Sequence, residues 1–171
     1  MDLSAFDLKG KVALITGGAH GIGFSIAEGM AKCGATICFN CSSEASLEKG
    51  MAAYKAAGID AHGYAADVSD EDAVNAMVAK IKAEVGPVDI LVNNAGITRD
   101  AMSYKMTASQ FDAAVKVSLY GSFYCVQQVV NGMRKRGYGR IVSMSSLASR
   151  GNVGQLNYAS AKAGIIAMTQ T

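Results

Sequence analysis

The stretch of sequence that decides the fold is Lys11-Val-Ala-Leu-Ile-Thr-Gly-Gly-Ala-His-Gly-Ile-Gly23. The run from Lys11 to Thr16 is short and continuously apolar, which is typical of a parallel strand that helices cover on both faces. Glycines follow at once, and apolar residues then recur at helical spacing from Ile22 to Cys33. A strand, a glycine-rich turn and a helix in direct succession predict the first half of a βαβ unit.

The rest of the chain repeats this alternation of strands and helices. Further strands are expected at 35–40, 59–66, 89–93 and 139–144, and helices at 22–33, 44–57, 70–85, from Thr107 to near Arg136, and from near Gln155 onward. Ser69 is expected to cap the helix at 70–85. Strands that alternate with crossover helices of this length predict an α/β fold: a Rossmann-type, doubly wound parallel sheet in a three-layer α/β/α arrangement.

The length of the chain fits one such domain. The 171 residues are enough for a single hydrophobic core but not for two. The sequence ends at Thr171 inside a helical run, without a residue that would stop the helix. We therefore expect residues 1–171 to form a single domain that is incomplete at the C-terminus.

Composition excludes several classes of protein. Half of the residues are hydrophobic and 18% are charged, which excludes a disordered chain. The net charge of +2 creates no strong positive field, so nucleic acid is not an expected partner. No apolar run reaches the 18 residues that a membrane span requires, and the start, Met1-Asp2-Leu3-Ser4, lacks a basic targeting region. These features predict a cytoplasmic protein that does not contact a membrane.

Three of the four cysteines have a spacing that is also found around iron–sulfur clusters. Cys33, Cys38 and Cys41 follow a C-x4-C-x2-C pattern, whereas Cys125 lies in a helical stretch far along the chain. Strand alternation, however, directs Cys38 and Cys41 to opposite faces of the sheet. The cysteines are therefore interpreted as small buried apolar side chains, and no metal site is expected.

The glycine-rich turn has the context of a dinucleotide site. Gly17 would permit the tight turn, Gly21 would let the backbone approach a pyrophosphate, and Gly23 would let the helix pack close to the strand. Free N–H groups at the start of the helix, together with the helix dipole, would then face the phosphates.

The end of the second strand indicates which dinucleotide is preferred. A carboxylate there would bind the ribose of NAD, but the sequence reads Phe39-Asn-Cys-Ser-Ser43. Ser42 and Ser43 can donate hydrogen bonds to a 2′-phosphate, and a protonated His20 can add positive charge. The sequence therefore favours NADPH over NADH. The alternatives are a solvent-facing His20 and serines that cap the next helix.

Three motifs together resemble the short-chain dehydrogenase/reductase family. They are Thr16–Gly23 as its glycine-rich turn, Asn93-Asn-Ala-Gly96 as its NNAG segment, and Tyr158-Ala-Ser-Ala-Lys162 as its YxxxK segment. Residues 93–100 look like the 3-oxoacyl-[acyl carrier protein] reductases and acetoacetyl-CoA reductases of the family. Residues 49–67 resemble gluconate 5-dehydrogenases instead. The resemblance implies that residues 1–171 form a single NAD(P)-binding Rossmann domain that lacks the last strands of the family.

The resemblance implies a set of catalytic residues. Tyr158 would donate the proton to a ketone that is being reduced, and Lys162, four residues on and on the same helix face, would stabilise the phenolate. The serine partner is open between Ser145 and Ser146, because one residue is missing between the strand and Tyr158; we favour Ser146, since a loop absorbs a deletion more easily than a strand. Ser118 stands where the family has an asparagine that anchors a proton-relaying water.

The predicted cofactor contacts come partly from the turn chemistry and partly from the resemblance. They are Gly17, His20, Gly21, Ile22, Gly23, Cys41, Ser42, Ser43, Asp67, Val68, Asn93, Ala95, Gly96, Tyr158 and Lys162.

Three functions are consistent with these residues. The first is NADPH-dependent reduction of a 3-oxoacyl thioester, carried by acyl carrier protein or CoA, to the 3-hydroxyacyl thioester. The second is a polyol or sugar-acid dehydrogenase, such as gluconate 5-dehydrogenase. The third is a truncated chain that binds nucleotide without catalysis. Arg134, Lys135 and Arg136 would offer an acidic carrier protein a docking patch, or would simply complement the helix dipole. By resemblance, the intact protein is expected to form a homo-oligomer through its last helices.

Overall fold

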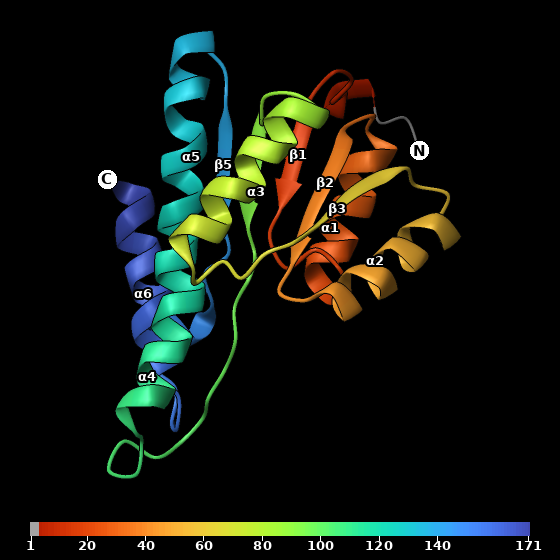
Figure 1. The fold of residues 1–171 in the computed structure, drawn as a ribbon. Coiled ribbons are helices and arrows are strands. Elements are labelled where there is room, and N and C mark those ends of the chain that lie inside the picture. Colours follow the sequence, from red (N-terminus) through yellow and green to blue (C-terminus); the bar gives the residue numbers. More distant parts are fainter. Residues whose placement is uncertain (1–3) are drawn as a thin grey trace.

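Five strands lie side by side in one parallel sheet in the computed structural model, which describes residues 4–171 (Figure 1). The residues Met1–Leu3, which contribute to the prediction of a cytoplasmic protein, lie outside the described residues. The strands are β1 Val12–Ile15, β2 Thr36–Cys41, β3 Ala61–Ala65, β4 Ile90–Asn93 and β5 Arg140–Ser143. Their order across the sheet is β3-β2-β1-β4-β5, and every neighbouring pair is parallel. The predicted α/β fold is therefore confirmed.

Helices cover both faces of this sheet and give it three layers (Figure 1). The helices are α1 Gly21–Lys32, α2 Glu44–Ala56, α3 Glu71–Glu84, α4 Ala108–Val115, α5 Gly121–Arg136 and α6 Leu156–Gln170. One core cluster joins the sheet to α3 and α5, and the other joins it to α1 and α2. Among residues 4–171, no helix combines the length and the apolar character that crossing a membrane requires.

The unbroken apolar strands follow from burial on both faces. All four residues of β1 are buried, and they alternate between the two core clusters: Leu14 packs with one and Ile15 with the other. Cys38 and Cys41 separate in the same way, so strand alternation keeps these two thiols on opposite faces. Burial raises the pKa of the Cys38 thiol to about 12, which keeps it protonated at neutral pH.

The strand order creates a crevice at one edge of the sheet. From β1 the chain moves outward through β2 to β3, then returns to β4 beside β1 and moves outward in the other direction to β5. The connections that leave the carboxyl ends of β1 and β4 therefore turn to opposite sides. In open α/β sheets, ligands bind in the crevice outside such a switch point.

Two features of the helices differ from expectation. Ser69 was predicted to cap α3, but this prediction is wrong: Asp70 is the N-cap, and its carboxylate accepts the Ala73 N–H at 3.1 Å. The hydroxyl of Ser69 donates to Asp67 at 2.8 Å instead, so it is already used in the preceding turn. The expected long helix to Arg136 is interrupted between α4 and α5 by a π-helical turn at Lys116–Tyr120.

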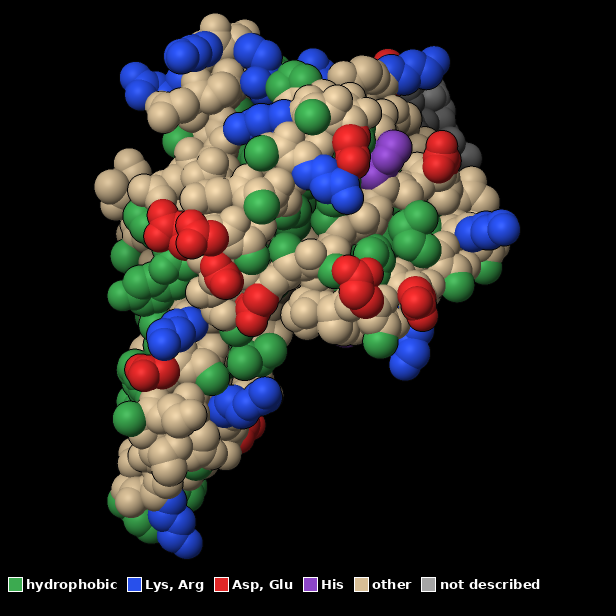
Figure 2. Space-filling model, viewed as in Figure 1, with side chains coloured by type: hydrophobic (Ala, Val, Ile, Leu, Met, Phe, Trp, Pro, Cys, Tyr) green, Lys and Arg blue, Asp and Glu red, His purple; other side chains and the backbone are tan. Residues whose placement is uncertain are grey.

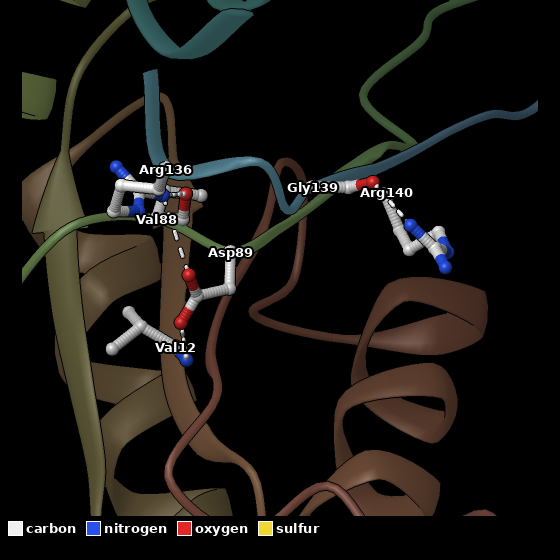
Figure 3. A network of polar contacts seen from close by, with 6 residues as sticks. All are labelled: Val12, Val88, Asp89, Arg136, Gly139 and Arg140. Carbon is white, nitrogen blue, oxygen red and sulfur yellow. Dashed lines mark hydrogen bonds and ion pairs between the residues drawn. The ribbon is translucent and has the colours of Figure 1, made fainter. Parts of the chain in front are cut away.

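One polar network joins three elements at the amino edge of the sheet (Figure 3). The carboxylate of Asp89, just before β4, accepts the Val12 N–H at 3.1 Å and pairs with Arg136 at 3.3 Å. The Arg136 guanidinium also donates to the Val88 carbonyl at 2.8 Å. Asp89 thus connects the start of β1, the start of β4 and the end of α5.

We expect Asp89→Ala to lower the free energy of unfolding by about 2 kcal/mol, because it leaves a backbone N–H and a guanidinium without their charged partner. Urea unfolding followed by circular dichroism measures this difference. Arg134→Ala, at an exposed residue of the same last turn of α5, is the matched control and should change stability by less than about 0.5 kcal/mol. Equal stability of Asp89→Ala and the wild type would contradict the structural role of the network.

Candidate active site

A cleft of about 690 Å³ opens at the carboxyl ends of the strands, in the crevice of the switch point. The predicted residues that line it are Gly17, His20, Ile22, Gly23, Cys41, Ser42, Asp67, Val68, Ala95, Gly96, Tyr158 and Lys162. The predicted residues outside its lining are Gly21, Ser43, Asn93, Ser118, Ser145 and Ser146. Segments from the whole length of the chain therefore meet at one site.

The glycine-rich turn lies tightly against the segment that follows β4. Gly17 has a φ of +63°, which favours glycine, and a Cβ at Gly23 would lie 2.5 Å from the Gly17 carbonyl oxygen and 2.6 Å from the Asn94 amide nitrogen. His20, the N-cap of α1, makes no side-chain capping bond. The first N–H groups of α1 are therefore available to an anion, which fits the pyrophosphate of a dinucleotide.

Sequence reasoning overlooked the residues that hold this turn in place. The Asn94 side chain donates to the carbonyls of Thr16 and Gly17 at 3.0 and 3.2 Å. The Thr16 hydroxyl in turn accepts the N–H groups of Asn94 and Ala95, both at 3.0 Å. Asn94 belongs to the quoted NNAG segment, but nothing local to that segment reveals a partner 78 residues away.

The end of β2, which contacts the glycine-rich turn, and the residues after β3 also line the cleft. Ser42 is exposed at the lining, whereas Ser43 is the N-cap of α2 and accepts the Ser46 N–H at 3.3 Å. Ser46 lines the cleft in its place. The side chain of Asp67, a carboxylate, also lines this part of the cleft. Of the two predicted serines, Ser42 is thus the one that faces the cleft.

Tyr158 and Lys162 lie on one face of α6 and both line the cleft. The Lys162 ammonium is 5.6 Å from the centre of the Tyr158 ring, and it donates to the Met144 carbonyl just after β5. Only 3% of Lys162 is exposed, and this burial lowers the pKa of its ammonium group. The arrangement places a positive charge, held by the backbone, close to a phenol that opens into the cleft.

The two candidate serines have different local roles. The Ser145 hydroxyl donates to the backbone carbonyl of Lys162 at 2.9 Å. The Ser146 hydroxyl accepts the Ala148 N–H at 3.1 Å and caps the 3-10 turn Leu147–Arg150. Ser145 therefore contacts the helix that carries Tyr158, whereas Ser146 stabilises the loop that follows β5.

Ser118 lies in the π-helical turn, beneath the cleft. Its hydroxyl is fully buried and has no hydrogen-bond partner among the described residues. A Cβ at Gly96 would lie 3.3 Å from this hydroxyl oxygen and 3.6 Å from the Lys162 nitrogen, so both polar groups flank Gly96. A buried hydroxyl without a partner next to an ammonium group fits a water-binding position.

Asn93 does not reach the cleft. It is 98% buried at the end of β4, and its amide nitrogen donates to the Ser143 hydroxyl of β5 at 3.2 Å. The side chain thus connects the two strands, while the backbone after it leads into the cleft through Asn94, Ala95 and Gly96.

The predicted basic patch lies at the other edge of the sheet. Arg134, Lys135 and Arg136 end α5, immediately before β5 begins, whereas the cleft is at the carboxyl ends of the strands. Figure 2 shows Lys and Arg side chains gathered over this end of α5. All three residues are exposed, but the Arg136 guanidinium is engaged with Asp89 and Val88.

Comparison with known proteins identifies the family. The family model for short chain dehydrogenase matches residues 11–171. The chain belongs to this family. It is similar to a 2-dehydro-3-deoxy-D-gluconate 5-dehydrogenase of Formosa agariphila, with 41% identity over 99% of this chain and 65% of the relative. It is also similar to an acetoacetyl-CoA reductase of Allochromatium vinosum, with 45% identity over 93% of this chain and 66% of the relative.

A third relative is a 3-oxoacyl-[acyl-carrier-protein] reductase of Aquifex aeolicus, which is 40% identical over 96% of this chain and 67% of its own length. The resemblance inferred from the three motifs is thereby confirmed. The chain spans slightly less than two thirds of the length of the first relatives that it matches. Relatives of this family act on both sugar acids and acyl thioesters, as their names state.

Proposed function

We propose that this protein reduces a ketone to a secondary alcohol with NADPH, and that its substrate is a 3-oxoacyl thioester. The observation that carries the proposal is the pairing of Tyr158 and Lys162 on one wall of the cleft whose other wall is the glycine-rich turn. A site that only bound nucleotide would not need a proton donor. The family and the acetoacetyl-CoA reductase relatives support the same chemistry.

In this mechanism each residue has a defined task. When bound, the nicotinamide cofactor would supply the hydride that reduces the carbonyl carbon. Tyr158 gives its phenolic proton to the carbonyl oxygen, which becomes the hydroxyl of the product, and the Lys162 ammonium stabilises the phenolate that remains. Ser145 or Ser146 completes the group of hydrogen-bond donors. Ser118, near Lys162, holds a water through which Tyr158 regains a proton.

The proposal is tested by the absorbance of NADPH at 340 nm. Acetoacetyl-CoA is offered to the 171-residue chain with NADPH, and 2-dehydro-3-deoxy-D-gluconate is offered in parallel with NADP+. Oxidation of NADPH with the thioester, seen as a fall in absorbance, supports the proposed substrate. Reduction of NADP+ with the sugar acid, seen as a rise in absorbance while the C5 hydroxyl is oxidised, would support the second candidate, which the relative from Formosa agariphila favours. No change with either, while NADPH still binds, would leave a nucleotide-binding chain without oxidoreductase activity.

The preference for NADPH is proposed from the end of β2. Ser42 lines the cleft there, and no carboxylate follows β2 before Glu44. Ser42 would donate to the 2′-phosphate, and Cys41 and His20 line the same cleft.

Replacing Ser42 with Asp should reverse this preference. A carboxylate repels the 2′-phosphate and can accept hydrogen bonds from the ribose hydroxyls of NADH, so the ratio of NADPH to NADH affinity should fall by on the order of a hundredfold. Cofactor fluorescence titration measures both affinities. Ser43→Asp, one residue on at the N-cap of α2, is the matched control and should change the ratio much less. An unchanged ratio in Ser42→Asp would contradict the assignment.

We also propose that this protein forms a homo-oligomer. Large apolar side chains are exposed on the helical region from the π-helical turn to α6: Tyr120, Phe123 and Ile166. Light scattering distinguishes an oligomer from a monomer.

A carrier protein bound at Arg134 and Lys135 would lie at the edge of the sheet opposite Tyr158. Within one subunit, the geometry therefore favours a CoA thioester over an acyl carrier protein as the substrate.

A further inference from the structure

Asn157 immediately precedes Tyr158 and is completely buried. An amide in the interior must satisfy both its donors and its acceptor, or it costs free energy. Its nitrogen donates to the backbone carbonyl of Arg99 and to that of Gln110, both at 2.9 Å. Its oxygen accepts the Tyr158 N–H at 2.8 Å. One side chain thus connects α6 to the segment after β4 and to α4.

The start of α6 depends on this side chain. Gln155 is the N-cap but makes no capping bond, because its side chain bonds to Asp100 at 3.0 Å and accepts from Asn152 at 2.8 Å. Tyr158 is the third residue of the helix, so its N–H has no partner within the helix. The Asn157 oxygen supplies that partner and takes over the role of the missing cap.

The segment that Asn157 holds is part of the cleft. Gly96 and Arg99 line the cleft on the side of Tyr158, and the Ala101 N–H donates to the Gly154 carbonyl at 2.9 Å just before α6. The two bonds from Asn157 therefore fix the start of α6 at two places, one of them in the lining itself. No other described residue of α6 makes side-chain bonds both to this segment and to α4.

We propose that Asn157 is a positioning residue. It sets the position of the Tyr158 phenol relative to the segment after β4 that lines the cleft. The inference rests on the proposed function, in which Tyr158 is the proton donor. The position of the Tyr158 phenol then depends on the buried amide of Asn157 as well as on Lys162. Loss of the amide leaves the phenol and the ammonium present but lets the start of α6 move, and a displacement of about 1 Å can cost on the order of a hundredfold in rate.

The test combines kinetics with a chemical probe that needs no turnover. Tetranitromethane nitrates tyrosines through their phenolate form, and mass spectrometry gives the extent of nitration at each residue. Tyr104, which is 76% exposed, is the internal reference. The variants are Asn157→Ala and the milder Asn157→Ser, whose hydroxyl retains one donor. Asn152→Ala, an exposed asparagine that bonds only to Gln155, is the matched control.

If Asn157 positions Tyr158, nitration of Tyr158 relative to Tyr104 falls roughly tenfold in Asn157→Ala, because the phenolate loses its fixed cation. The kcat falls by on the order of tenfold to a hundredfold, whereas KM and the Kd for NADPH stay within about twofold. Asn157→Ser shows a smaller change in the same direction, and Asn152→Ala shows none. A merely structural role would lower the melting temperature without changing the nitration ratio.

The two possible failures are distinguishable. Wild-type Tyr158 that is nitrated faster than Tyr104, with the same ratio in both Asn157 variants, would overturn the positioning role and leave the proposed function intact. Wild-type Tyr158 that is no more reactive than Tyr104, together with an absence of ketone reduction, would overturn the proposed function and this inference with it. If Asn157→Ala does not fold, Asn157→Ser decides between these outcomes by the same ratio.

Discussion

Tyr158→Phe is expected to reduce the kcat for ketone reduction by on the order of a thousandfold. The Tyr158 ring lines the cleft with its centre 5.6 Å from the Lys162 ammonium, and replacing tyrosine with phenylalanine takes away the proton donor while preserving the ring. The carbonyl oxygen of the substrate would then carry its developing charge without the phenolic proton donor beside it. Stopped-flow absorbance at 340 nm with saturating NADPH measures the loss.

The control for this variant separates chemistry from binding. The Kd for NADPH should change by less than about threefold, because the glycine-rich turn and the end of β2, which are proposed to bind it, are unchanged. Tyr120→Phe removes the hydroxyl of an exposed tyrosine in the π-helical turn and should leave kcat unchanged. A Tyr158→Phe variant that retains most of its activity would place the proton donor elsewhere, and the Tyr158 side chain would then only line the cleft.

Gly23→Ala is expected to have the second large effect, on both cofactor binding and stability. The added methyl group would lie 2.5 Å from the Gly17 carbonyl oxygen and 2.6 Å from the Asn94 amide nitrogen. Neither neighbour can move without a cost in free energy, because the Gly17 oxygen belongs to the backbone and the Asn94 amide makes two hydrogen bonds to the turn. We expect a loss of about 1–3 kcal/mol in the free energy of unfolding and at least about a hundredfold weaker NADPH binding.

Thermal unfolding and fluorescence titration with NADPH measure the two effects of Gly23→Ala. The matched control lies six residues further along α1. Gly29 has no neighbour within 4 Å of an added Cβ and no positive φ, so Gly29→Ala should stabilise the helix by up to about 1 kcal/mol and leave binding unchanged. Normal NADPH affinity in Gly23→Ala would show that the turn does not need close contact with the segment after β4.

Local patterns were sufficient for the class of fold and for much of the site. Continuous apolar strands and helically spaced apolar residues are properties of short windows, so the βαβ alternation could be predicted within one to three residues at most boundaries. The side chains of Tyr158 and Lys162 lie on one face of α6 because helical geometry alone brings i and i+4 together. The glycines of the turn likewise reflect conformations and close approaches that only glycine allows.

Some details were decided by competition between neighbouring groups. Asp70 caps α3 in place of Ser69, because Asp67 already engages the Ser69 hydroxyl in the preceding turn. Arg136 was grouped with Arg134 and Lys135 as a docking patch, but the carboxylate of Asp89 and the Val88 carbonyl lie within its reach. Which partner a polar side chain takes depends on every group nearby, and these include groups far away in the sequence.

By itself, the sequence determined that this protein is an α/β chain with a glycine-rich turn and a tyrosine–lysine pair, since each of these is encoded in local patterns of the sequence. Only the tertiary structure decided how the parts meet: that Asn94 clamps the turn, that Ser42 and not Ser43 faces the cleft, and that Asn157 ties α6 to two other segments. The physical reason is that hydrogen bonds between distant segments depend on strand order and helix packing, which no local pattern contains.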